Sequence, residues 1–266
     1  MLVAETDLTA EQFREISRTV YEIAGILLPK GKEGLVRSRL AKRLRAVGAT
    51  TYDEYLAQVR GRDGGELAQM IDALTTNKTN FFREPAHFDF LRHRVLPALG
   101  GGPLRFWSAG CSTGEEPYTL GMVLRDALPD LGRRDVKILA TDISRRVLTQ
   151  AKAGVYADGP ASDIASDVLR RHFTRTAGGW EIAPAVRSLV TFASLNLMGP
   201  WPMRGPFQAI FCRNVMIYFD RPTQQRLVQR FHELLAPGGY LFVGHSESLS
   251  AIDHGFAYVQ PAVYRR

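Results

Sequence analysis

The stretch WSAGCSTGEEPY, residues 107 to 118, has the form of a glycine-containing turn that leads from a strand into a helix. Its glycines, Gly110 and Gly114, are spaced GxxxG, whereas a dinucleotide-binding turn has the spacing GxGxxG. Glu115 and Glu116 occupy the first helical turn, where a phosphate would meet free N–H groups in such a fold. The pattern therefore argues against NAD and ATP. It favours a ligand that lacks phosphate and carries positive charge.

The two glutamates also have a purely structural interpretation, because acidic side chains in a first helical turn stabilise the helix. Ser112 and Glu115 match a capping box, and Thr113 and Glu116 match a competing one. Only one box can form at one helix start. We therefore assign Glu115 to capping and leave Glu116 for a ligand.

The region around and beyond this turn alternates short apolar runs with helical segments. The runs are LRFWSAG, VKILATD, SLVTFAS, FQAIFC, YLFVGH and AYVQPAVYRR. Such alternation predicts βαβ crossovers and an α/β, Rossmann-like fold with a mainly parallel sheet. Residues 154 to 187 are too long and too mixed for one crossover helix, so we expect an inserted subdomain of short strands there.

The N-terminal part of the chain predicts only helices. Capping-box patterns begin at Thr9 and Thr51, residues 32 to 47 have helical spacing, and GELAQMIDALTT adds a fourth helix. The chain is therefore expected to have a helical domain (residues 1–75) and an α/β domain (103–266), joined by residues 76–102.

Composition restricts the class of protein and its compartment. Hydrophobic residues make up 45% of the 266 residues, and no apolar run approaches the roughly 20 residues that span a bilayer. The two cysteines, Cys111 and Cys212, form no CxxC motif, and the histidines are not clustered along the chain, so neither a disulfide nor a metal site is expected. A reducing cytoplasm fits best. The formal net charge of +7 favours a polyanionic partner: nucleic acid, an anionic membrane surface or an acidic protein.

Residues 30 to 45, KGKEGLVRSRLAKRLR, hold seven basic side chains against one acidic. At helical spacing the apolar side chains share one stripe: Val36, Leu40, Leu44 and Val47. The opposite side carries three cations: Arg39, Lys42 and Arg45. We expect these three to bind an acidic protein partner. An ordinary solvated face is the alternative, and an RNA-binding patch is disfavoured because no aromatic residues interleave.

S-adenosylmethionine has a sulfonium, an ammonium and a ribose diol, and it lacks phosphate. The second predicted strand ends in ATDIS, where Asp142 can accept hydrogen bonds from both ribose hydroxyls. The structural alternative for Asp142 is an N-cap of the next helix, although Ser144 can take that place.

Several motifs occur in order along nearly the whole chain: TTNKTNFFRE, WSAGCSTGEEPY, ATDIS, LNL, FQAIFCRNVMIYFD and GGYLFVGHSES. Together they resemble the bacterial chemotaxis receptor methyltransferases of the CheR type. The resemblance implies a class I methyltransferase fold with an antiparallel last strand, an inserted antiparallel β-subdomain and an N-terminal all-helical domain. It also implies that residues 76–102 form a linker and helix that contribute to the cofactor site. It implies S-adenosylmethionine-dependent methylation of glutamate side chains on chemoreceptor cytoplasmic helices, with S-adenosylhomocysteine as product.

The resemblance also implies roles for individual residues. Arg83 and Tyr218 would line the methyl-transfer site. The cofactor-binding set is Asn77, Thr79, Arg83, Glu116, Asp142, Asn196, Leu197, Arg213 and Asn214. From the residues alone, Tyr218 could equally be a core aromatic and Arg83 a surface ion-pair partner.

The implied partner is the cytoplasmic domain of a chemoreceptor, and the implied location is the cytoplasm at receptor arrays. We expect a monomer that neither binds nucleic acid nor inserts into a membrane. A nucleic-acid methyltransferase is the first alternative, but the turn NVMIY, residues 214 to 218, lacks the two prolines of an amine-methylating turn. A non-catalytic, cofactor-binding adaptor is the second. GHSES lacks the last glycine of GxSxG, so Ser246 is not expected to be a nucleophile.

Overall fold

The structure is a computed structural model that describes residues 7–61, 64–159 and 164–266. It divides into two compact units, which we describe separately. The helical unit comprises Met1–Thr76 with Tyr218–Asp220, and the α/β unit comprises Asn77–Ile217 with Arg221–Arg266. Among the described residues, none of the helices is long and apolar enough to cross a membrane.

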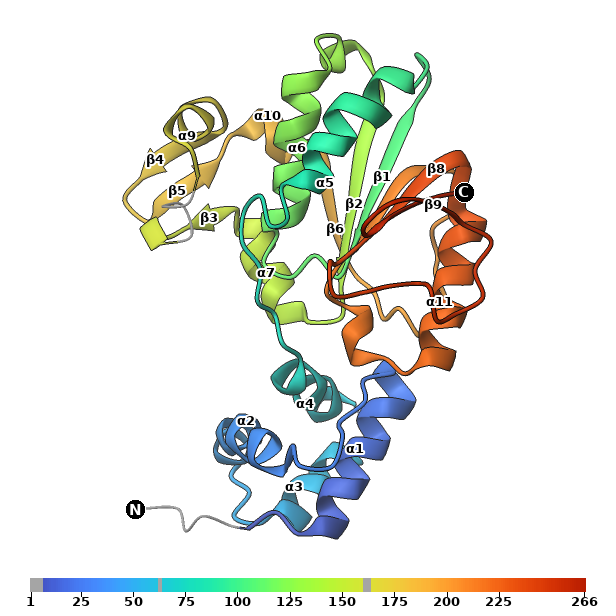
Figure 1. Cartoon of the computed structure of the whole chain (residues 1–266). Helices are drawn as coiled ribbons and strands as arrows, with labels where there is room; N and C mark the ends of the chain where they lie inside the picture. Colours follow the sequence, from blue (N-terminus) through green and yellow to red (C-terminus); the bar gives the residue numbers. More distant parts are fainter. Residues whose placement is uncertain (1–6, 62–63, 160–163) are drawn as a thin grey trace. The chain divides into compact units, whose positions relative to one another are not determined.

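Within its described residues, the helical unit contains four helices, in agreement with the sequence (Figure 1). They are α1 (Ala10–Ala24), α2 (Glu33–Val47), α3 (Tyr52–Val59) and α4 (Gly65–Leu74). Thr9 and Gln12 form the reciprocal capping box that starts α1, and the Thr51 hydroxyl accepts a hydrogen bond from the Glu54 N–H at the start of α3. The predicted all-helical N-terminal domain is confirmed.

Helix α2 buries the apolar stripe that its spacing predicts. Val36, Leu40 and Leu44 are buried, while Lys42 and Arg45 are exposed. Arg39 differs from these two cations. Its guanidinium is half-buried and donates to the carbonyls of Leu74 and Thr75 at 2.6 and 3.1 Å, and so satisfies groups at the end of α4 that have no partner within their own helix.

The α/β unit is built on a seven-stranded sheet with the order β6-β2-β1-β7-β8-β10-β9. Its strands are β1 (Leu104–Ala109), β2 (Val136–Asp142), β6 (Val190–Ser194), β7 (Phe207–Cys212), β8 (Leu235–Val243), β9 (Ala257–Gln260) and β10 (Val263–Arg265). Strands β6, β2, β1, β7 and β8 are parallel, β10 runs antiparallel to β8, and β9 runs antiparallel to β10. The predicted sheet, with its antiparallel end, is confirmed.

One strand prediction needs correction. AYVQPAVYRR reads as a single run in the sequence but forms the hairpin β9–β10. Pro261 cannot donate a ladder hydrogen bond, and Ala262 has a φ of 64°, so the chain reverses between the two strands.

Helices cover both faces of the sheet (Figure 1). On one face lie α6 (Glu115–Ala127), α7 (Arg145–Ala153) and α5 (Ala86–Phe90), which continues into η1 (Leu91–Val95) and η2 (Leu96–Ala98). Helix α11 (Arg221–Leu234) lies on the other face. The short helices η3 (Leu131–Arg133) and η4 (Met216–Tyr218) occupy connections. Phe211 and Phe242 stack in the core with ring centroids 4.3 Å apart.

A small three-stranded antiparallel sheet interrupts the alternation, as the sequence predicts. Its strands are β3 (Val155–Tyr156), β4 (Phe173–Thr176) and β5 (Gly179–Ile182), in the order β3-β5-β4. Two short helices flank it, α9 (Ser166–His172) and α10 (Pro184–Arg187). The rings of Phe81 and Tyr156 meet edge to face at 4.8 Å, which packs this sheet against the linker.

Gly179 is the position in this small sheet that tolerates no side chain. Its φ is 126°, and an added Cβ would lie 2.2 Å from the Tyr156 carbonyl oxygen. We expect Gly179→Ala to lower the free energy of unfolding by at least about 2 kcal/mol in urea denaturation. Gly178→Ala is the matched control, since the nearest atom to its Cβ is 3.6 Å away, and equal effects of the two substitutions would contradict the prediction.

Candidate functional site

The turn between β1 and α6 has a backbone that only glycine adopts readily. Gly110 and Gly114 have φ values of 90° and 97°. A Cβ on Gly110 would lie 2.4 Å from Cγ2 of Val215, which follows β7. The turn therefore packs directly against the connection after the neighbouring strand.

The capping box predicted for α6 is wrong. The helix starts at Glu115 behind Gly114, and no side chain caps it. The Ser112 hydroxyl donates to the Asn77 carbonyl at 2.9 Å, and the Thr113 hydroxyl donates to the Glu115 carboxylate at 2.6 Å. Because the glycine at the cap position reverses the backbone, both hydroxyls make other bonds than those of a capping box.

The two glutamates that open α6 have different surroundings. Glu115 is buried, and burial raises the pKa of its carboxyl despite the Thr113 hydrogen bond. Glu116 accepts a hydrogen bond from the Ser108 hydroxyl at 2.7 Å and pairs with Arg213 at 3.1 Å. Ser108 and Arg213 lie at the carboxyl ends of β1 and β7, so Glu116 is the glutamate at the ligand-binding edge of the sheet. The assignment of Glu116 to cofactor binding stays a prediction, and it now rests on this position and no longer on the capping box.

Asp142 ends β2 and holds two turns at once. Its Oδ2 accepts the Ser112 N–H at 2.8 Å, and its Oδ1 accepts the Ser144 N–H at 2.9 Å. The Ser144 hydroxyl caps α7, which leaves Asp142 out of the capping role. A carboxylate has about four acceptor sites, so these backbone bonds are compatible with a role of Asp142 in accepting from ribose hydroxyls.

Arg213 is the central cation of the site. Its side chain is 2% exposed and lies 3.0 Å from Glu84 and 3.1 Å from Glu116. It also donates to the Arg83 carbonyl. Burial pushes the pKa of Glu84 upward, but the charge of Arg213 outweighs this effect and holds that pKa below its ordinary value. Arg213 thus joins the linker to α6.

Arg83 lies in a strained part of the linker. Phe82 and Glu84 on either side have φ values of 53° and 55°, in the left-handed region that non-glycine residues rarely occupy. The Phe82 N–H donates to the Thr119 hydroxyl at 3.2 Å, and the half-buried Arg83 side chain donates to the Lys78 carbonyl at 2.8 Å. Such strain persists only where neighbours enforce it, and it is concentrated at functional sites.

Glu247 is a site residue that the sequence did not identify. It is buried after β8, and its carboxylate accepts the N–H groups of Asn214 at 2.7 Å and Ile217 at 3.1 Å, and also that of Gly244. Burial raises its pKa, and these backbone bonds oppose the rise. Glu247 thereby holds Asn214, a predicted cofactor residue with a φ of 59°, after β7. Glu247 lies in GHSES, a string that we compared with GxSxG only to judge whether Ser246 is a nucleophile.

The remaining predicted residues lie near the same connections. The Asn196 side chain accepts the Met198 N–H at 3.0 Å, and the Leu197 carbonyl accepts from Arg230 at 2.7 Å, which shapes the turn after β6. Asn77 and Thr79 are half-buried in the linker. Tyr218 ends η4 and groups with the helical unit, where its carbonyl accepts the Leu27 N–H at 2.8 Å.

Asp142, Arg213 and Asn196 lie at one edge of the sheet, because the parallel strands β2, β7 and β6 all end there. Asp142 and Glu116 supply carboxylates for hydroxyl and ammonium groups, and Asn196 follows β6. The helix N-terminus beside them carries acidic side chains, which disfavour a phosphate ligand. The donor set fits S-adenosylmethionine.

Comparison with known proteins agrees with this geometry. Residues 11–75 match the family model described as CheR methyltransferase, all-alpha domain, and residues 77–264 match CheR methyltransferase, SAM binding domain. The chain belongs to the CheR methyltransferase family. The predicted family, fold class and cofactor are confirmed: the chain is a methyltransferase that depends on S-adenosylmethionine.

Curated relatives resemble the chain over nearly its full length. The chemotaxis protein methyltransferase of Escherichia coli strain K12 is 42% identical, over 97% of this chain and 91% of that protein. A probable chemotaxis protein methyltransferase of Rhizobium etli is 40% identical, over 92% of this chain and 96% of that protein. The chemotaxis protein methyltransferase of Borreliella burgdorferi is 35% identical, over 98% and 95%.

The role predicted for Asp142 is tested with Asp142→Asn. We expect this substitution to weaken S-adenosylmethionine binding by about 1.5–3 kcal/mol in calorimetry, since it removes charge-assisted hydrogen bonds. Ser144→Ala is the control: it removes the cap of α7 but keeps the carboxylate, so affinity should be retained.

Weaker binding by Asp142→Asn could come from a lost ribose contact or from a change in the turn. A 2′-deoxy analogue of the cofactor distinguishes the two causes. The native enzyme should lose affinity for the analogue, whereas Asp142→Asn should discriminate much less between analogue and cofactor. If both proteins lose equal affinity, the ribose assignment is wrong.

Proposed function

We propose that the chain methylates glutamate side chains on the cytoplasmic domain of a chemoreceptor and forms glutamate methyl esters. The observation that carries the proposal is the match to both CheR family models, together with relatives named chemotaxis protein methyltransferases. This match favours receptor methylation over a nucleic-acid methyltransferase. We further propose that the enzyme works in the cytoplasm at receptor arrays.

The bound cofactor supplies an electrophilic methyl group on its sulfonium. Asp142 would hold its ribose, Glu116 its ammonium, and Asn196 with Leu197 would flank its adenine. We propose that Asn77, Thr79 and Arg83 of the linker close the site. Two contacts support this role, because Ser112 binds the Asn77 carbonyl and Arg213 binds both Arg83 and Glu84.

The chain needs no general base for this reaction, because a glutamate carboxylate has an ordinary pKa near 4.3 and is ionised at neutral pH. Its residues must instead position that carboxylate and exclude water. Such positioning can lower the activation barrier by roughly 7–11 kcal/mol. We assign Arg83 to hold the carboxylate through charge-assisted hydrogen bonds and Tyr218 to orient it.

The proposed reaction is tested with methyl-labelled S-adenosylmethionine and a receptor cytoplasmic fragment. We expect label in the receptor that is released by alkali as methanol, since methyl esters hydrolyse and methylated amines do not. Label that resists alkali would contradict the glutamate substrate, and absence of label with intact cofactor binding would favour the adaptor alternative.

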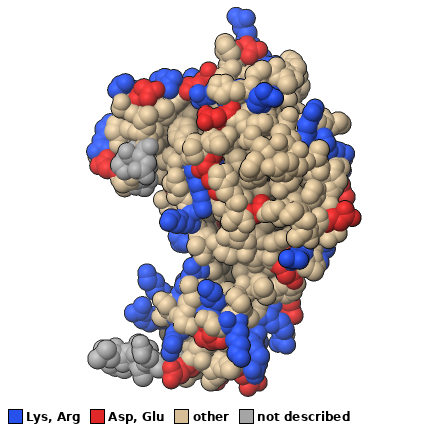
Figure 2. All heavy atoms as spheres, in the orientation of Figure 1, with Lys and Arg blue, Asp and Glu red and all other residues tan. Residues whose placement is uncertain are grey.

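We also propose that the basic face of α2 binds the receptor. Figure 2 shows lysine and arginine side chains gathered over the helical unit on the face drawn. Several cations of this helix make contacts inside the unit: Arg37 pairs with Asp7 at 3.0 Å, Arg43 forms a two-point pair with Glu66, and Arg39 binds the end of α4. Lys42 and Arg45 are exposed, so they are the better candidates for the acidic receptor helices.

This surface is tested by reversing the charge of the two exposed cations in the double variant Lys42→Glu with Arg45→Glu. We expect kcat/KM for the receptor fragment to fall at least about tenfold at low salt, because steering by opposite charge raises the association rate. The salt dependence should flatten, and cofactor affinity should stay within about twofold.

Arg94→Glu with Arg133→Glu is the matched control, because both arginines are exposed on the α/β unit and the change in net charge is equal. An equal loss in the control would show that net charge, and not the face of α2, governs the encounter.

A further inference from the structure

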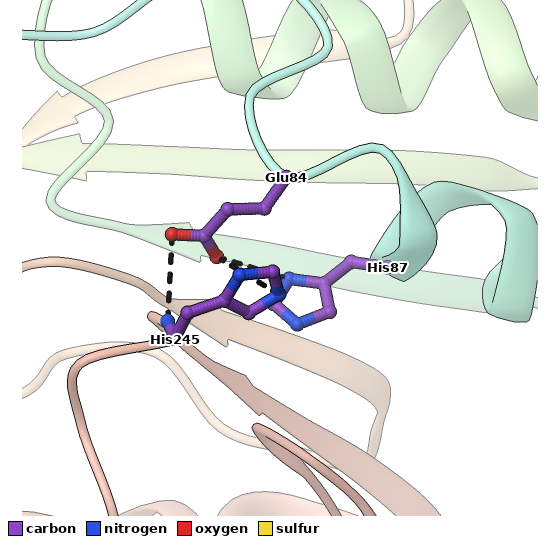
Figure 3. A group of neighbouring side chains, drawn as sticks. All are labelled: Glu84, His87 and His245. Carbon is purple, nitrogen blue, oxygen red and sulfur yellow. Dashed lines mark hydrogen bonds and ion pairs between the residues drawn. The ribbon is translucent and has the colours of Figure 1, made fainter.

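Three side chains of metal-binding types meet in the α/β unit, two of them close together in the sequence and the third far along the chain. Glu84 lies in the linker, His87 in α5, and His245 just after β8 (Figure 3). Oε2 of Glu84 is 3.5 Å from Nδ1 of His87 and 4.0 Å from Nε2 of His245. One ligand atom from each side chain lies within 4.8 Å of the others. The sequence argument against a metal site considered only histidines clustered along the chain.

The His87 ring is buried and, among the described residues, has no hydrogen-bond partner. Its exposure is 0%, and within residues 7–61, 64–159 and 164–266 neither of its ring nitrogens makes a hydrogen bond. A neutral imidazole presents a nitrogen lone pair, the form in which histidine binds metals. An unsatisfied buried polar group is unfavourable, and a bound ion would give one of these nitrogens a partner.

The donor set selects the kind of ion. Two imidazoles and one carboxylate match zinc and related divalent transition metals, whereas calcium and magnesium prefer oxygen ligands. Bonds of about 2.0–2.1 Å in a tetrahedral site place ligand atoms about 3.3 Å apart. The His245 side chain is 54% exposed, so rotation of this ring can close the remaining gap. Solvent can reach the fourth position from the same side.

Arg213 is the neighbouring charge that such a site must accommodate. Its guanidinium lies 3.0 Å from Oε2 of Glu84. An oxygen of a carboxylate has two lone pairs, so Glu84 can accept from Arg213 with one and bind an ion with another. Carboxylates that bind metals are commonly held by such second hydrogen bonds.

We propose that Glu84, His87 and His245 form a binding site for one divalent transition-metal ion, with zinc as the fitting ion. The ion would join the linker, α5 and the end of β8. It would lie beside Arg83 without using any of the side chains that we assign to the cofactor's ribose or adenine.

The site is tested with cobalt(II) as a spectroscopic substitute for zinc in the full-length protein. We expect one equivalent to give the visible absorption of tetrahedral coordination, and zinc to displace it. His245→Ala should weaken binding at least about tenfold, because it removes one of three protein ligands. His93→Ala is the matched control, since His93 is exposed on η1 and is not one of the three clustered side chains, so this substitution should leave binding unchanged.

Two further measurements do not depend on enzyme activity. Zinc should raise the melting temperature of the native protein but not that of His245→Ala, because binding to the folded state stabilises it. A crystal grown with zinc should show anomalous density between Glu84, His87 and His245. Equal binding by native protein and His245→Ala, loss of binding in His93→Ala, or density elsewhere would overturn the proposal, whatever the outcome for receptor methylation.

Discussion

The pairing of Arg213 with two carboxylates is the interaction on which the site depends. A buried guanidinium is unfavourable unless charges and hydrogen bonds surround it, and loss of one partner from such a group costs about 3–5 kcal/mol. The partners come from different segments, Glu84 from the linker and Glu116 from the first turn of α6. The same guanidinium also binds the Arg83 carbonyl. The electrostatic requirement of one cation therefore sets the backbone path of the segment that carries Arg83.

Buried carboxylates perform a second task at this edge of the sheet, which is to satisfy backbone N–H groups in tight connections. Asp142 accepts two such groups after β1 and β2, and Glu247 accepts those of Asn214, Gly244 and Ile217 after β7 and β8. Connections here cannot rely on sheet or helix hydrogen bonds, yet they are too buried for water to serve every donor. An anionic acceptor meets several donors from one side chain. The acidic character of the site thus has a structural origin as well as a role in ligand binding.

The sequence predicted what depends on local patterns. The capping box at Thr9, the apolar stripe of α2 and the β-rich run that became β2 involve residues close together in the chain, so period and composition are sufficient. The α6 cap failed because Gly114 and the contacts of Ser112 with Asn77 and Asp142 decide it, and these span long separations. Glu84 and Glu247 were missed for the same reason. Their partners, Arg213 and Asn214, lie in a different part of the chain, and no spacing rule predicts such pairs.

The proposed substrate is negatively charged, and it must approach acidic side chains of the α/β unit. A glutamate that donates its carboxylate must approach the acidic side chains of Glu84, Glu116 and Asp142. Two like charges 4 Å apart near a protein surface repel by about 4 kcal/mol at an effective dielectric constant near 20. Arg213 neutralises part of this negative charge, but its side chain is buried and is paired with Glu84 and Glu116. Arg83 is half-buried in the adjoining linker and is thus better placed than Arg213 to meet an incoming carboxylate. Under the proposed function, the strain at Phe82 and Glu84 is the structural cost of holding Arg83 beside these carboxylates.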